Sequence, residues 1–302
     1  MTSTYLRLAL AALLWGGTFV AARGISQDIG PYSAAFLRFF LASVVLIPLV
    51  IREESRLPGL DFRQLMAVIL LGLSGVFAYN VFFFSGLKTV EAGRAAVIIA
   101  ANPVFIALFS FLIFRERFSL QKIIGIVLSV SGAIVVISRG DVHAILQGGI
   151  GIGELYLIGC VVSWVAYTLI GKKVMIGLTP LVAVAYSSVF GALFLLPGAV
   201  IEGVWSSIQT LNVAIVGSLA YLSIFGTVLG FVWFYRGVKE IGPARAGVFI
   251  NLVPVSGVFF GVIILGEKLS SSLLIGGLLV LFGLVLTNRT AGEAAIQAKL
   301  TD

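Results

Sequence analysis

Charged residues are scarce in this chain of 302 residues, at 11%, while hydrophobic residues make up 60%. A soluble chain carries roughly 25% charged residues, so this deficit excludes a soluble globular protein. The sequence has one cysteine, Cys160, and one histidine, His143. An intramolecular disulfide is therefore excluded, and no residues with metal-ligand spacing are found. Because paired carboxylates inside the apolar segments are lacking too, we predict no catalytic site, no metal and no cofactor.

Long apolar runs dominate the sequence instead. A hydrocarbon core about 30 Å thick needs about 20 helical residues per crossing. Ten segments approach this length: residues 5–22, 33–51, 65–87, 94–114, 122–138, 154–171, 180–200, 212–236, 245–265 and 272–288. The sequence therefore predicts an all-α polytopic membrane protein with ten transmembrane helices.

The positions of the cations favour one orientation. With the N-terminus inside, 14 of the 20 Lys and Arg residues lie on the cytoplasmic side and 6 on the other. The positive-inside rule then predicts that both termini are cytoplasmic, and we expect a multi-pass protein of a bacterial inner (plasma) membrane. The net charge of +7 is spread over short loops, so the expected surroundings are the lipid bilayer, with no nucleic acid as partner.

The chain contains an internal repeat. Between residues 86 and 132, 16 of 47 positions are identical to the residue 151 positions further on. Matched pairs include Arg94 with Arg245, Pro103 with Pro254, Glu116 with Glu267 and, at an offset of 149, Trp15 with Trp164. Because each half has five crossings, an odd number, the second half enters from the opposite side. This predicts two inverted repeats (5+5) related by a pseudo-two-fold axis in the membrane plane, at residues 1–138 and 154–302, with an external linker at 139–153 and a short cytoplasmic tail.

The duplicated pattern resembles the drug/metabolite transporter superfamily, in its ten-helix branch with two EamA-type repeats. The resemblance is carried by Trp15-Gly16, Leu37-Arg38-Phe39, the apolar runs around Pro103 and Pro254, and residues 115–117 and 266–268. It implies a secondary transporter, with bacterial exporters of amino acids, including aromatic ones, as the strongest comparison. It also implies rocking of the helix pairs 64–115 and 213–267. Residues 8–22 contain no carboxylate, so the proton-coupling glutamate of the small four-helix members is absent here.

Polar and aromatic residues at mid-membrane depth predict a cavity, because lipid offers no hydrogen bonds. Each of these side chains taken singly is explained as well by helix packing, but the group suits a wall for an amphipathic solute. The expected lining is Trp15, Tyr79, Asn80, Asn102, Trp164, Tyr167, Tyr221 and Asn251. Aromatic faces can hold an ammonium or a ring, and amide and hydroxyl groups can meet a carboxylate. This combination favours an amino acid as substrate.

Prolines and glycines inside the spans predict where the helices bend and approach one another. The expected gating or hinge residues are Pro103, Pro254, Gly226, Gly230, Gly257 and Gly261. Three charged residues are expected to be structural. Arg38 would reach the outer surface or bond a neighbouring carbonyl, with contact to the substrate as the alternative. Glu116 and Glu267 would hold a turn together or pair with a cation.

We therefore expect an exporter of small metabolites, most directly amino acids, that works by alternating access through a central cavity. A drug or carboxylate exporter is the alternative within transport. A membrane-embedded enzyme or a non-transporting receptor subunit are alternatives of other classes. Small residues on one face of the fifth span, Gly125, Ser129 and Ala133, are compatible with a homodimer as well as a monomer.

Overall fold

The chain folds as a bundle of helices in a computed structural model that describes residues 2–102, 104–106, 109, 120–141, 150–174, 177–209, 211–241, 246 and 249–300. These residues contain no strand. Six helical segments are long and apolar enough to cross a membrane, and four shorter apolar helices lie at the other four predicted spans. The predicted all-α membrane architecture is confirmed.

The helices of each half follow the predicted spans closely. The first half contains α1 (Thr2–Ile25), α2 (Pro31–Glu54), α3 (Phe62–Leu71), η1 (Gly72–Ala78), α4 (Tyr79–Leu87), α5 (Ala92–Ile99) and α7 (Leu120–Ile137). The second contains α9 (Ile152–Val174), α10 (Pro180–Ile201), α11 (Val204–Gln209), α12 (Val213–Ala220), η2 (Tyr221–Leu229), α13 (Gly230–Ile241), η3 (Phe249–Asn251), α15 (Leu252–Leu265) and α16 (Ser271–Leu300). Two differences stand out among the described residues. The helix α5 ends at Ile99, inside the predicted fourth span, and α16 continues beyond the predicted end of the last span at residue 288.

Local capping explains several of the helix starts. The helices α2 and α10 both begin with a proline, Pro31 and Pro180, where the fixed φ suits the first helical position and no backbone donor is lost. The Thr179 hydroxyl accepts from the Val182 N–H at the start of α10. Asp61 and Gln64 form a reciprocal capping box at the start of α3, so two backbone donors of the first turn are satisfied.

The two halves run in opposite directions. At the end of α1, Arg23 donates to the carbonyl of Leu87, the last residue of α4. At the start of α9, a Cβ on Gly153 would meet the Thr89 side chain, just beyond the same end of α4. The first helix of the first repeat therefore ends where the first helix of the second repeat begins, which is the inverted arrangement predicted for an odd number of crossings.

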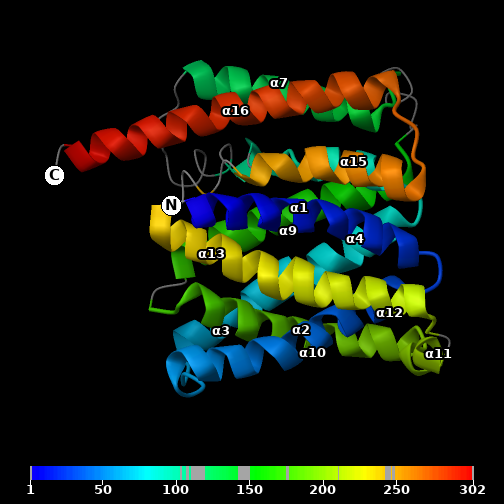
Figure 1. Cartoon of the computed structure of the whole chain (residues 1–302), viewed down its shortest axis with the longest axis vertical. Coiled ribbons are helices and arrows are strands. Elements are labelled where there is room, and N and C mark those ends of the chain that lie inside the picture. Colours follow the sequence, from blue (N-terminus) through cyan, green and yellow to red (C-terminus); the bar gives the residue numbers. More distant parts are fainter. Residues whose placement is uncertain are drawn as a thin grey trace.

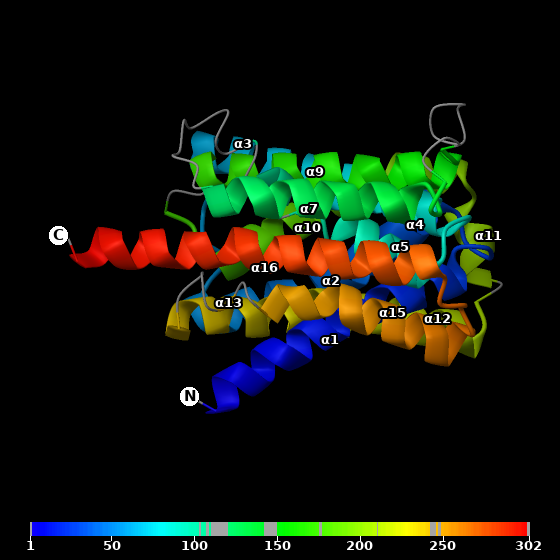
Figure 2. The same cartoon turned by 90° about the horizontal axis from the view of Figure 1, so that it is seen from above.

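The start of α1 and the end of α16 lie at one end of the bundle, which we call the terminal end; the opposite end, where α7 finishes and α9 begins, is the linker end (Figure 1). The pair α7 and α16 forms one edge of the molecule and the pair α2 and α10 the other, with the remaining helices between them (Figure 1 and Figure 2). The central helices are therefore flanked by one pseudo-symmetric pair on each side.

The small-residue face of the fifth span is used within the chain. Ser129 donates to the carbonyl of Val280 at 3.1 Å, and a Cβ on Gly283 of α16 would meet the backbone of Gly125. Ala133, on the same face, is buried. The prediction that this face is available to a second copy is corrected, because α16 already covers it.

Candidate functional site

Each repeat contains one π-helical segment at the same place. The segments η1 (residues 72–78) and η2 (residues 221–229) overlap when the chain is shifted by 151 positions. Such wide turns are rare and are frequently found at functional sites. Side chains donate hydrogen bonds to backbone carbonyls of both π-helical segments. Asn80 donates to the carbonyls of Gly75 and Val76 at 3.3 and 2.8 Å, and Thr227 donates to the carbonyl of Leu222, five residues earlier, at 2.9 Å.

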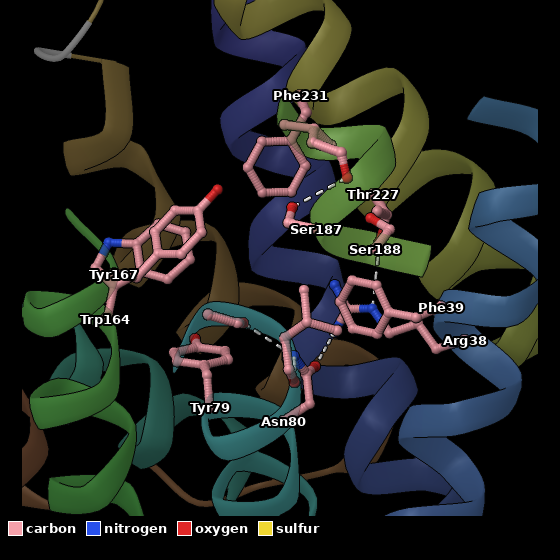
Figure 3. Close-up of a pocket in the computed structure, with 13 residues that line it drawn as sticks. Arg38, Phe39, Tyr79, Asn80, Trp164, Tyr167, Ser187, Ser188, Thr227 and Phe231 are labelled. Atoms are coloured by element: carbon pink, nitrogen blue, oxygen red, sulfur yellow. Dashed lines mark hydrogen bonds between the residues drawn. The ribbon is translucent and has the colours of Figure 1, made fainter. Parts of the chain in front are cut away.

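A cavity lies beside these two segments, with about 50 Å³ accessible to the centres of water molecules. Seven helical elements supply its wall: α2, η1, α4, α9, α10, η2 and α13 (Figure 3). The lining residues are Arg38, Phe39, Gly75, Val76, Tyr79, Asn80, Trp164, Tyr167, Val184, Ser187, Ser188, Thr227 and Phe231. Both repeats therefore contribute to one polar and aromatic chamber.

The repeat offsets place this cavity on the pseudo-two-fold axis. Eight of its thirteen lining residues form four equivalent pairs, two at an offset of 149 and two at an offset of 151. The pairs are Arg38 with Ser187, Phe39 with Ser188, Val76 with Thr227, and Asn80 with Phe231. At these four pairs the positions are duplicated but the side chains differ, so equivalent positions give the chamber different chemistry on its two sides.

Arg38 is the charged residue of this wall, and only 8% of it is exposed. Its Nη1 donates to Asn80 Oδ1 at 3.1 Å and its Nε to Thr227 Oγ1 at 3.3 Å, as Figure 3 shows. Its guanidinium carbon lies 5.1 Å from the centre of the Phe39 ring. The sequence analysis expected Arg38 to reach the surface or bond a carbonyl. The structure instead places it between side chains of both repeats.

An aromatic wall faces the arginine across the chamber. The rings of Tyr79 and Trp164 have centroids 5.4 Å apart, and Trp164 stacks on Tyr167 at 5.1 Å. These three residues and Asn80 are four of the eight predicted lining residues, and the structure brings them together at the cavity.

Comparison with known proteins assigns the chain to a family. The profile of the EamA-like transporter family matches residues 2–138 and 151–289. The chain belongs to the EamA-like transporter family. Its relatives include an uncharacterized transporter of Archaeoglobus fulgidus, 30% identical over 288 residues, which cover 95% of this chain and 97% of the relative. Another is the uncharacterized transporter YyaM of Bacillus subtilis, 28% identical over 281 residues, or 93% of this chain and 92% of the relative.

Two further matches concern substrate and fold. A probable terminal-alkyne amino-acid exporter of Streptantibioticus cattleyicolor is 29% identical over 286 residues, covering 93% of this chain and 92% of that protein. A solved structure described as "Crystal structure of protein" superposes with a TM-score of 0.66 at 21% identity, covering 97% of this chain and 99% of the other. The first match is at the level of the family and the second shows the fold. This EamA-type chain is thus a multi-pass membrane transporter.

Two predicted lining residues of the transporter lie outside the cavity. Trp15 Nε1 donates to the carbonyl of Gly226 at 2.9 Å, and the Tyr221 hydroxyl donates to the carbonyl of Leu14 at 2.9 Å. Both bonds join α1 to η2. Trp15 can lie this close to η2 and α13 because position 230 is glycine: a Cβ there would stand 2.5 Å from Trp15 Nε1.

The equivalent position in the first repeat is Tyr79, whose ring contacts Trp164. Trp15 therefore bonds the backbone of η2, whereas Trp164 lines the cavity.

The two predicted asparagines are also separate from the chamber. Asn102 is buried, and its Oδ1 has no hydrogen-bond partner among the described residues. Asn251 closes the short turn η3. Neither residue lines the cavity.

The proline runs interrupt helices in both repeats of the EamA-type fold. In the first repeat, α5 ends at Ile99. Backbone hydrogen bonds between residues three apart follow it, from Ala101 N to the carbonyl of Ile98 and from Val104 N to the carbonyl of Ala101. In the second, the 3-10 turn η3 precedes α15, of which Pro254 is the third residue. Pro254 therefore lies just after a break rather than inside an unbroken helix. Pro103 lies outside the described residues.

The four predicted glycines of the second repeat lie at close contacts. A Cβ on Gly226 would meet Thr18, and one on Gly230 would meet Trp15. A Cβ on Gly257 would stand 2.6 Å from the Ala96 Cβ, and one on Gly261 would meet the Glu267 carboxylate. These glycines let α13, η2 and α15 approach their neighbours. Their proposed part in gating remains a prediction.

Glu267 holds the two repeats together at the linker end. Its Oε1 accepts from Ala92 N at 2.5 Å and its Oε2 from Gly93 N at 2.9 Å. A carboxylate is favourable at this position because the first turn of α5 has free donors and a positive dipole end. The sequence analysis expected a turn or an ion pair, whereas the structure shows a cap on a helix of the other repeat. Glu116, its equivalent, lies outside the described residues.

Nine of the thirteen lining residues were not predicted to line the cavity: Arg38, Phe39, Gly75, Val76, Val184, Ser187, Ser188, Thr227 and Phe231. A signal for some of these residues existed in the repeat. Shifting Arg38 and Phe39 by 149 gives Ser187 and Ser188, and shifting Asn80 by 151 gives Phe231. The missing piece of information was that Arg38 itself faces the cavity.

Proposed function

We propose that this transporter exports small amphipathic metabolites, amino acids in the first place, by alternating access through the cavity between the repeats. One observation carries the proposal: the chamber lies on the pseudo-two-fold axis and takes equivalent positions from both halves. In transporters built from inverted repeats, the substrate site lies at the repeat interface near mid-membrane. Rocking one repeat against the other would expose such a site to each side in turn.

The chemistry of the wall supports an amphipathic solute. Tyr79, Trp164 and Tyr167 offer ring faces, which suit an apolar or aromatic group and can also receive an ammonium. Hydroxyl and amide groups of Ser187, Ser188 and Asn80 lie in the same wall. A relative named as a probable exporter of a terminal-alkyne amino acid is consistent with this substrate class.

The moving parts follow from the contacts between repeats. We propose that residues 64–115 and 213–267 rock about the helix breaks near Ile99 and Pro254. The bonds from Ala92 and Gly93 to Glu267 would close the linker end. In this proposal both termini are cytoplasmic, the protein lies in a bacterial inner membrane as a monomer or homodimer, and it has no enzyme activity.

The experiment is solute flux across reconstituted vesicles. Liposomes containing the purified protein are loaded with radiolabelled L-phenylalanine, L-leucine or L-propargylglycine. The rate of efflux is compared with that from protein-free vesicles. The proposal expects efflux above background for at least one amino acid, and competition among them. A matched panel of cationic drugs and simple carboxylates is measured in parallel. Background rates for every amino acid, with flux of a drug alone, would overturn the amino-acid assignment.

A further inference from the structure

We propose that Arg38 binds the carboxylate of the transported solute, and that the solute's amino group is dispensable. The proposal rests on the function proposed above, since it concerns what the same cavity recognises. It names the substrate class more narrowly: small monocarboxylates with an apolar or aromatic remainder.

The charge balance of the cavity carries the first step. Arg38 lies within the membrane-spanning part of α2 and is almost fully buried. Within the described part of the chain, no acidic side chain forms an ion pair with it, and no Asp or Glu lines the cavity. A buried cation without a counter-ion is costly, and ionisable groups at this depth are a mark of a substrate or ion pathway. A bound carboxylate would supply the missing charge.

The hydrogen bonds of the guanidinium carry the second step. Arginine has five N–H donors, of which Nη1 and Nε each contribute one to Asn80 and Thr227. In the described part of the chain, Nη2 has no hydrogen-bond partner. Both present acceptors are neutral, and bonds to a carboxylate are roughly twice as strong. The planar fork therefore has donors left for a carboxylate, which arginine binds in a bidentate manner.

The two π-helical segments fix the direction of this fork. The Asn80 amide nitrogen donates to the carbonyls of Gly75 and Val76, so the Asn80 Oδ1 is turned toward Arg38 and accepts from it. Thr227 gives its hydroxyl hydrogen to Leu222, so its oxygen is free to accept from Arg38 Nε. One widened turn from each repeat thus supplies a hydrogen-bond acceptor to the guanidinium.

The opposite wall explains why the amine is not required. Tyr79, Trp164 and Tyr167 present rings and no negative charge, so an ammonium there would gain a cation–π contact while an uncharged apolar group would gain burial. The strongest fixed recognition element is positive. A solute lacking the carboxylate would meet a repelling charge, whereas a solute lacking the ammonium would lose only a weak contact.

The test compares three probes of the same skeleton: L-phenylalanine, 3-phenylpropanoate and phenethylamine. Binding to the purified full-length protein is followed by intrinsic tryptophan fluorescence, since Trp164 lines the cavity, and flux is followed in liposomes. Both acids are expected to bind and to compete with each other, and the amine to bind at least roughly tenfold more weakly. Equal or tighter binding of phenethylamine, or binding by neither acid, would overturn the inference.

Two arginine variants sharpen the assignment. Arg38→Gln should abolish the preference for acids over the amine, and Arg38→Lys should restore part of it. Arg94→Gln is the matched control, because Arg94 is also buried but donates to the carbonyl of Val136 outside the cavity, and it should keep the wild-type preference. If Arg38→Gln does not fold, the wild-type comparison of the three probes still decides. Flux of some solute without any preference for acids would refute the carboxylate site and leave the proposed function intact, whereas absence of all flux would refute the function itself.

Discussion

The two tryptophans at equivalent positions of the repeats have different surroundings and different partners. Trp164 stacks on Tyr167 at the cavity, while Trp15 donates to the carbonyl of Gly226 and packs on Phe234. The difference is traced to one pair of positions, Tyr79 in the first repeat and Gly230 in the second. A bulky ring keeps Trp164 in the chamber, and the missing side chain lets Trp15 join two helices.

The same contrast extends across the axis. Arg38 comes from the first repeat, and its equivalent Ser187 is uncharged; Asn80 carries a polar amide, and its equivalent Phe231 is apolar. Equivalent positions thus carry side chains of different polarity in the two repeats. A site made from two identical halves could not orient an asymmetric solute, whereas this one has a polar pole and an aromatic pole. The following predictions break or sharpen this contrast, beginning with the largest effect.

Filling the space beside Trp15 should have the largest effect. Gly230→Ala places a Cβ 2.5 Å from Trp15 Nε1 and 3.2 Å from the carbonyl oxygen of Phe225, and overpacking of this kind costs about 3 kcal/mol. The free energy of unfolding in mixed detergent measures it. Gly217→Ala is the control, because its Cβ would meet nothing within 4 Å. Equal stability of the two variants would show that the glycine is not what seats Trp15.

Removing the amide acceptor of Arg38 should come next. Asn80→Leu leaves the guanidinium without one of its two acceptors and frees the carbonyls of Gly75 and Val76. Loss of a bond to a charged group is worth about 2 kcal/mol, or roughly thirtyfold in flux. Phe231→Leu alters the equivalent position of the second repeat and should change flux far less. Similar losses in both variants would contradict the functional asymmetry of the axis.

The tryptophans themselves should separate stability from recognition. Trp15→Phe removes the bond to Gly226 and should lower the free energy of unfolding by about 1 kcal/mol without altering the order in which solutes bind. Trp164→Phe should reorder solute affinities and leave unfolding nearly unchanged. Unfolding is measured in mixed detergent and binding by competition. A change in solute order with Trp15→Phe would mean that the two sites are not divided as described.

The smallest effect is expected at the helix break of the second repeat. Pro254 follows the turn η3 and is buried at the start of α15. Pro254→Ala should allow the helix to extend across the break, which would slow turnover while leaving equilibrium binding unchanged, because gating rather than contact with solute is altered. Efflux rates and dissociation constants measured on the same preparation test this. Wild-type turnover would reduce Pro254 to a packing feature.

The sequence was sufficient for the fold because its repeat includes residues that apolar composition alone does not explain. A matched arginine, proline and glutamate in each half fixed the offset, and the odd number of crossings then required inversion. Half of the predicted lining, including Tyr79 and Trp164, also lies at the cavity.

The rest depended on features that residue types do not encode. The π-helical register of η1 and η2 is a matter of backbone hydrogen bonds, and without it Asn80 and Thr227 do not converge on Arg38. The exclusion of Trp15 follows from a glycine 215 positions away in the chain. The burial of Arg38 likewise depends on how α2, α4 and η2 pack against one another.

The central claim is that the chamber on the pseudo-two-fold axis is the solute path. The single cysteine, Cys160, makes a direct measurement practicable. In a Cys160→Ser background, Ser188→Cys places a thiol in the cavity wall, and its reaction with a charged, membrane-impermeant thiol reagent is timed with and without L-phenylalanine. The account predicts that the thiol reacts in the transport-active protein and that the solute slows the reaction. A thiol that stays unreactive from both sides of the membrane while flux continues would contradict it.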